Sequence, residues 1–137
     1  MQASAKIRPG IIVSACLTGV CCRYDGGHRL DENVMRLSPE VDLVPLCPEQ
    51  MGGLTTPRQP CEIIGGDGDD VLDGRARVVD TEGRDVTGQL LKGANEFFRI
   101  AERSKIKKAI MKEKSPSCGV HRIYRNGILV SGKGVLT

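Results

Sequence analysis

The sequence predicts an α/β domain with a mainly parallel sheet and a C-terminal hairpin. Three short apolar runs close to glycine or proline have the length and composition of buried strands: 11–15, 42–46 and 108–111. An amphipathic segment precedes the third run, and this strand–helix–strand order favours a parallel sheet with a right-handed crossover. Asn126-Gly127 lies within an apolar stretch at 123–130, which predicts a hairpin turn.

Length and composition limit the organisation and the class of the protein. With 137 residues, 39% of them hydrophobic, we predict a single domain over 1–137 with a flexible tail at 1–9. No apolar run resembles a secretion signal or a membrane span, which predicts a cytoplasmic protein. The net charge of +3 is mildly basic, but aromatic residues make up only 3%, so the stacking surface of a nucleic-acid binder is missing.

The first half of the chain contains one further helix and two loops. Residues 16–28 are polar and glycine-bearing, which indicates a binding loop or a structural cap. Leu30, Val34 and Leu37 recur at helical spacing behind Asp31, which can cap a short helix. Residues 51–60 hold two glycines and two prolines, which predicts a loop that walls or covers a pocket.

The second half begins with short extended segments and continues into a long helix. Residues 61–64 form a predicted strand, and 65–70 a tight acidic turn that lacks the ligand pattern of a calcium-binding loop. Val71-Leu72 and 76–79 are predicted as extended segments. Thr87 can cap a helix that runs to about Ser104, whose apolar face includes both phenylalanines, so both are expected in the core.

Three cysteines stand at or after the ends of the three apolar runs: Cys16, Cys47 and Cys118. Because ligands of open α/β sheets bind at the carboxyl ends of strands, we expect these thiols to converge. Cysteines in a chain without an export signal favour metal binding or catalysis over disulfides. Three thiolates leave one coordination position open, as in a cubane iron–sulfur cluster with one unliganded iron. Three ordinary buried thiols fit the same spacing.

Two polar side chains lie close to these cysteines in sequence. Glu49 is two residues after Cys47, and Ser115 is three residues before Cys118. A carboxylate at such a site can accept a proton from water, and a hydroxyl can hydrogen-bond or relay a proton. Alternatively, Glu49 is a surface residue or an acceptor for backbone amides, and Ser115 only starts a turn before Pro116.

Taken together, the motifs of this chain resemble the thiouracil desulfidase family. They are, in chain order, Ser14-Ala15-Cys16-Leu17-Thr18-Gly19, Cys22-Arg23-Tyr24-Asp25-Gly26-Gly27, Cys47-Pro48-Glu49, Gly66-Asp67-Gly68 and Lys114-Ser115-Pro116-Ser117-Cys118-Gly119. The resemblance covers almost the whole chain. It implies a Rossmann-like domain that holds a [4Fe-4S] cluster by Cys16, Cys47 and Cys118, with one iron not ligated by protein, and a catalytic pair of Glu49 and Ser115.

The same resemblance implies a substrate and a reaction. A small thiolated pyrimidine such as 2-thiouracil would lose its sulfur as hydrosulfide and become the oxo compound, without redox change. Relatives continue past the hairpin into another helix and strand. This chain stops at Thr137, so a second copy could cover the exposed face as a homodimer.

Three other functions remain open from the sequence. A tRNA thio-modification enzyme could use a similar three-cysteine cluster, but it would need an RNA-binding surface. A structural zinc module could add His28 or His121 to the three cysteines. Persulfide chemistry without metal would need a thiol of low pKa, and Lys114 near Cys118 keeps that alternative open.

Overall fold

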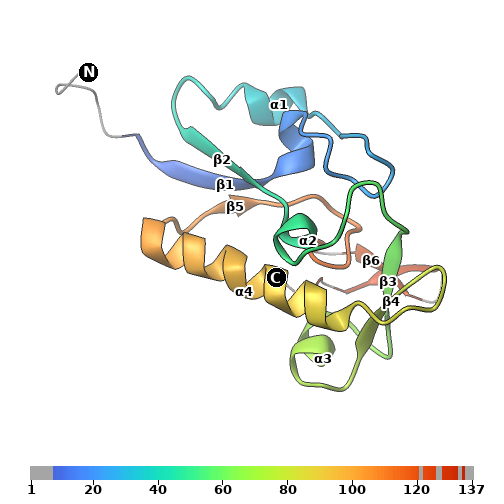
Figure 1. The fold of residues 1–137 in the computed structure, drawn as a ribbon. Helices are drawn as coiled ribbons and strands as arrows, with labels where there is room; N and C mark the ends of the chain where they lie inside the picture. The colour runs from blue at the N-terminus through green and yellow to red at the C-terminus, as the bar shows by residue number, and fades with distance from the viewer. Residues whose placement is uncertain (1–7, 121, 126–127, 133, 135–137) are drawn as a thin grey trace.

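The computed structural model describes residues 8–120, 122–125, 128–132 and 134 (Figure 1). Its elements, in chain order, are β1 (Gly10–Ser14), η1 (Ala15–Thr18), α1 (Glu32–Met35), β2 (Asp42–Leu46), α2 (Pro48–Met51), β3 (Cys61–Ile64), α3 (Gly68–Leu72), β4 (Arg77–Asp80), α4 (Thr87–Ser104), β5 (Ala109–Ile110), β6 (Arg122–Arg125) and β7 (Ile128–Ser131). No helix in this described part of the chain is both long and apolar enough to span a membrane.

The central sheet is parallel, which confirms the predicted α/β class. Its strand order is β2-β1-β5, with β1 paired in parallel to both neighbours. After β1 the chain adds β2 on one side of it, and later adds β5 on its other side. Ligands of open α/β sheets bind outside the carboxyl ends of the strands at such a change of direction.

The strand before the long helix does not join this sheet, contrary to the simple crossover expected from the sequence. β4 pairs antiparallel with β3, in the register Cys61↔Asp80 to Ile64↔Arg77. Figure 1 shows α4 running from this pair back towards β5, so the helix links two separate sheets. The core between the β3–β4 pair and α4 contains Ile63, Val78 and Leu90, each fully buried.

Residues 68–72 are helical, so the predicted turn at 65–70 and the extended Val71-Leu72 are wrong. The Asp67 carboxylate accepts a hydrogen bond from the amide of Asp69 (3.0 Å), and the Asp70 carboxylate accepts one from the amide of Asp67 (2.9 Å). This capping box starts α3. Val71 is buried against the core while Leu72 is exposed.

The long helix α4 is confirmed, but two details of it are corrected. Phe97 is buried, whereas Phe98 is 62% exposed and lies outside the core, because adjacent helical positions differ by about 100°. Thr87 is the first helical residue rather than the cap, and its Oγ1 accepts from the amide of Val78 at 2.8 Å. The Asp85 carboxylate accepts the amide hydrogen of Thr87 instead.

A short helix follows Cys47 directly and packs closely on α4. Proline at the first position of α2 favours a helix start, because no amide hydrogen is needed there. Gly52 and Gly93 form the contact: a Cβ on Gly52 would collide with the carbonyl oxygen of Gln89, and one on Gly93 with that of Pro48. The predicted loop at 51–60 therefore begins after this helix.

The other predicted elements are confirmed, with one correction in the first loop. Asp31 caps α1 by accepting from the amides of Asn33 and Val34. β6 and β7 pair antiparallel as the expected hairpin, while its Asn126-Gly127 turn lies outside the described residues. The segment expected as an irregular loop from residue 16 instead starts with η1, which contains Cys16.

Of the predicted tail at 1–9, the structure describes Arg8 and Pro9, and both contact Asp42 at the start of β2. Arg8 pairs with Asp42, and the carbonyl of Pro9 accepts the amide hydrogen of that residue at 2.9 Å. Residues 1–7 lie outside the described part.

Candidate functional site

A pocket of about 440 Å³ lies at the carboxyl ends of the parallel strands, where the sheet topology predicts a site. Its lining includes all five residues singled out in the sequence, Cys16, Cys47, Glu49, Ser115 and Cys118. They come from η1, from the start of α2, and from the turn that follows β5. The structure therefore brings together side chains that are far apart in sequence.

The turn carrying Cys118 is fixed from two directions. The hydroxyl of Ser14, at the end of β1, accepts the amide hydrogen of Lys112 at 2.7 Å. Gly134 donates its amide hydrogen to the carbonyl of Gly119 at 2.9 Å, and a Cβ at this glycine would lie 2.6 Å from the Pro116 carbonyl oxygen. A side chain at Gly134 would therefore displace the turn.

Cys22 is a further thiol that lines the pocket. It is buried, and the Cys47 thiol donates to its backbone carbonyl at 3.9 Å. Hydrogen bonding by the Cys22 side chain lowers the pKa of Cys16 to about 7, with help from Lys112 and Arg23, and the pKa of Cys47 to about 6. Because Cys22 is the donor, its own pKa is raised.

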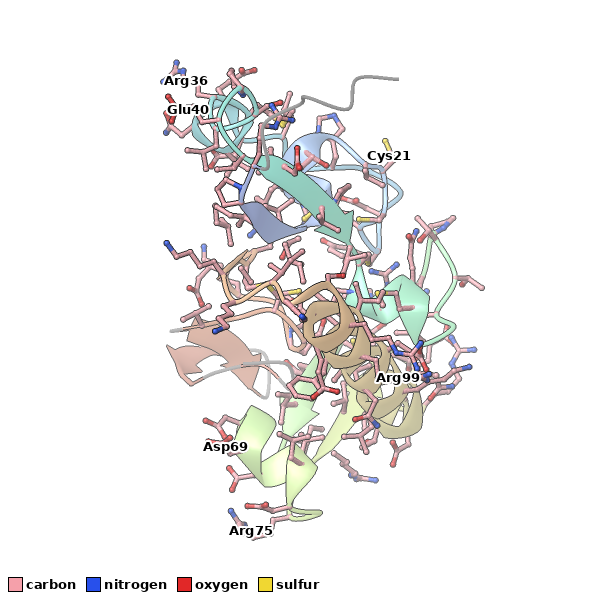
Figure 2. All side chains as sticks on the ribbon, turned by 90° about the vertical axis from the view of Figure 1, so that its left-hand side faces the viewer. Cys21, Arg36, Glu40, Asp69, Arg75 and Arg99 are labelled. Atoms are coloured by element: carbon pink, nitrogen blue, oxygen red, sulfur yellow. The ribbon has the colours of Figure 1, made fainter. Side chains whose placement is uncertain are left out.

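The other cysteines differ in their surroundings. Burial raises the pKa of Cys118 to about 12, so this thiol is protonated at neutral pH unless a metal replaces the proton. Burial likewise raises the pKa of Cys61. Cys21 is exposed and does not line the pocket, and Figure 2 shows it on the outer edge of its loop. All six thiols are free.

The described residues contain no set of three or more His, Cys, Asp or Glu side chains placed to hold one metal ion. His28, one of the two histidines considered as a further ligand of a zinc module, is exposed, and its Nδ1 accepts the amide hydrogen of Leu30. His121 lies outside the described part. A cubane cluster has a different requirement, since each thiolate binds a separate iron and the sulfurs need only surround a shared space.

Glu49 is held from both sides of its carboxylate. Oε1 accepts from Nε of Arg58 at 3.3 Å, and Oε2 accepts from the hydroxyl of Ser117 at 2.9 Å. The Glu49 side chain is 14% exposed and that of Arg58 only 8%. The alternative of a freely solvated surface glutamate is therefore wrong. The carboxylate lies in the pocket wall in a fixed orientation.

The two serines of the Cys118 turn have different hydrogen bonds. The Ser115 hydroxyl accepts the amide hydrogens of Ser117 and Cys118 at 3.2 and 3.1 Å, as expected for a residue that starts a turn. It lies 3.4 Å from Oε2 of Glu49, farther than the Ser117 hydroxyl. Ser115 thus orients the turn, while Ser117, only 1% exposed, gives Glu49 its shorter hydrogen bond.

Basic side chains predominate among the charged groups of the pocket. They are Arg23, Arg29, Arg58, Lys112 and Lys114, against Glu49 and Glu113. Burial lowers the pKa of Lys112, whose ammonium donates to the carbonyl of Glu113 at 2.9 Å. The pocket therefore favours negatively charged or electron-rich ligands.

A model of the 2-thiouracil desulfurase family matches residues 11–137, nearly the whole chain. The chain belongs to this family. It is 44% identical over 128 residues to the uncharacterized protein YbbK of Bacillus subtilis (strain 168), covering 91% of this chain and 85% of YbbK. Among solved structures, the [4Fe-4S]-dependent thiouracil desulfidase TudS (DUF523Vcz) matches with a TM-score of 0.79 and 38% identity, over 95% of this chain and 83% of that one.

Three residues that line the pocket or contact its lining in this 2-thiouracil desulfurase family member were not predicted as functional. Ser117 and Cys22 stand inside motifs of the chain, and Ser117 is next to Cys118, so position within a motif was an available signal. Arg58 lies in the glycine- and proline-containing loop that was predicted to wall a pocket, and it does line the pocket. Nothing in the local sequence identifies it as the partner of Glu49.

Proposed function

We propose that this chain is an iron–sulfur-dependent desulfidase acting on 2-thiouracil or a related small thiolated pyrimidine. The thiocarbonyl compound and water give the oxo compound and hydrosulfide with one proton, so no oxidant or reductant is needed. Membership of the 2-thiouracil desulfurase family and the likeness to TudS support the reaction class. The observation that carries the proposal is that three cysteines and a fixed carboxylate line one pocket.

Cys16, Cys47 and Cys118 are the proposed ligands of a [4Fe-4S] cluster with one iron left open. The donor set fits, because three thiols on three separate segments surround one pocket, and two of them have a lowered pKa. The basic lining suits the negative charge of the thiolates. When bound, such a cluster supplies a Lewis-acidic iron that binds a thiocarbonyl sulfur and withdraws electron density from its carbon.

Glu49 is the proposed base that takes a proton from the attacking water. Arg58 and Ser117 hold its two oxygens, so the carboxylate keeps one orientation without reorganising during the reaction. Ser115, 3.4 Å away, is the second member of the predicted catalytic pair and is proposed to steer protons or hold the ring. The carbon–sulfur bond breaks after water adds, and the sulfur leaves as hydrosulfide.

Glu49→Gln tests the role of the carboxylate, because the amide keeps the shape and loses the base. Hydrosulfide release from 2-thiouracil should fall ~10²–10⁴-fold, with iron and sulfide content unchanged in anaerobically prepared protein. Glu40→Gln, on the exposed segment after α1, is the matched control and should retain full activity. Wild-type turnover by Glu49→Gln with an intact cluster would refute Glu49 as the base, and full activity of iron-free protein would favour the persulfide alternative.

Other parts of the proposal concern partners and location. The free thiols fit the reducing cytoplasm, which we infer as the compartment. The partner is a small molecule rather than RNA. A homodimer stays a prediction that sedimentation analysis of the purified chain would check.

A further inference from the structure

Arg23 differs from the other basic residues of the pocket, because one nitrogen of its guanidinium group has no hydrogen-bond acceptor among the described residues. Its Nη1 atom is fully buried and has no hydrogen-bond partner among the described residues. Arg58 has Glu49 as its acceptor, and the Lys112 ammonium has a backbone carbonyl. A buried, charged donor without an acceptor is rare in folded proteins and destabilising. Arg23 therefore calls for a partner that the described residues do not supply.

The loop around Arg23 is closed and holds the residue in place. The amide of Arg23 donates to the carbonyl of Gly27 at 3.2 Å, and the carbonyl of Arg23 accepts from the amide of Gly26 at 2.9 Å. The guanidinium lies over the ring of Tyr24, 5.4 Å from its centre, in a cation–π contact. The position of the charge is therefore built into the loop and is not a random surface orientation.

Arg23 lies on the Cys16 side of the pocket. Both residues line it, and the loop that carries Arg23 is joined to Cys16, whose carbonyl accepts the amide hydrogen of Arg29 at 2.8 Å. On the other side, Arg58 already pairs with Glu49. The missing acceptor should therefore be an electron-rich group beside Cys16, and sulfur bound to iron is such a group.

We propose that Arg23 is the counter-cation of the iron–sulfur cluster, donating a hydrogen bond to a cluster sulfur on the Cys16 side and offsetting its negative charge. This inference rests on the proposed function. Hydrogen bonds to cluster sulfurs and nearby charge set the reduction potential of a cluster. A cation stabilises the reduced, more negative state, so Arg23 raises the potential. The same withdrawal of electron density makes the open iron a stronger Lewis acid towards a thiocarbonyl sulfur.

The test compares reduction potentials of anaerobically reconstituted protein, followed by absorbance and by the paramagnetic resonance spectrum of the reduced cluster. Arg23→Met should shift the potential to more negative values and change the spectrum, while turnover of 2-thiouracil falls. Arg23→Lys should give a smaller shift, because lysine keeps the charge but not the planar fork of donors. Arg36→Met removes an equal charge from the exposed end of α1 and should leave the potential unchanged (Figure 2).

An unchanged potential and spectrum in cluster-loaded Arg23→Met would overturn the inference. If that variant does not load, Arg23→Gln replaces it under the same criteria. If neither neutral variant loads but Arg23→Lys does, the need for a charge supports the inference, whereas failure of all three would mean that Arg23 is only structural. Wild-type protein without iron and sulfide, or without desulfidase activity, would instead refute the proposed function.

Discussion

Replacing Gly93 by alanine tests how much the close contact between α2 and α4 contributes to the stability of the fold. A Cβ at Gly93 would collide with the carbonyl oxygen of Pro48, a backbone atom that cannot rotate away. Alanine gains up to about 1 kcal/mol in helix propensity, but overpacking costs about 1–3 kcal/mol. Because the obstacle is backbone, we expect the upper part of that cost and a net destabilisation of about 1–2 kcal/mol. For a chain of this size that lowers Tm by about 3–10 °C.

Gly88→Ala is the matched control, since it makes the same change near the start of the same helix. Nothing lies within 4 Å of a Cβ at Gly88, so alanine there should raise Tm slightly. Thermal unfolding followed by circular dichroism measures both variants. Iron content should also fall in Gly93→Ala, because α2 begins directly after Cys47 and carries Glu49. A Gly93→Ala protein as stable as Gly88→Ala, with full iron content, would refute the reasoning.

Three shorter predictions concern side chains that line the pocket or contact its lining. Cys47→Ser should lose most of the iron and Cys21→Ser, at an exposed thiol, should keep it; equal iron content by metal analysis would contradict the ligand assignment. Ser117→Ala should lower kcat about 10-fold in wild type but not in the Glu49→Gln background, because it acts through the hydrogen bond to Glu49; Ser117→Thr should recover part of the rate. In metal-free protein, alkylation of Cys47 measured by mass spectrometry should accelerate as pH rises through about 6, where its thiolate forms, whereas Cys118, with a pKa of about 12, should stay unreactive at pH 8.

Local patterns predicted the parts of the fold that depend on local chemistry. The apolar run of β1 and the apolar face of α4 identified two elements correctly, because burial follows the period of a strand or a helix. α3 was missed although Asp67 and Asp70 form its capping box, because Val71-Leu72 alone fits a strand equally well. Phe98 was wrongly predicted to lie in the core, because an apolar stripe on a helix does not show which of its edges contacts the core.

The candidate site was predicted as a set of residues but not as a network of contacts. Convergence of strand ends accounts for the shared pocket of Cys16, Cys47 and Cys118. The partners of Glu49 depend on loop geometry: Ser117 is 68 residues away in sequence, and Arg58 reaches the carboxylate from an irregular loop. Nor does any pattern show that Nη1 of Arg23 lacks an acceptor among the described residues, because that property depends on every neighbour at once.

The fixing of the Cys118 turn by Gly134 has a consequence for the order of events during protein synthesis. Cys16 and Cys47 leave the ribosome 102 and 71 residues before Cys118 (118 − 16 and 118 − 47), and Gly134 follows later still. At about 5–20 residues per second, the first two thiols exist for several seconds without the third. Since the pocket needs all these segments, it is complete only after Gly134 has emerged, and the first two thiols must be kept reduced until then.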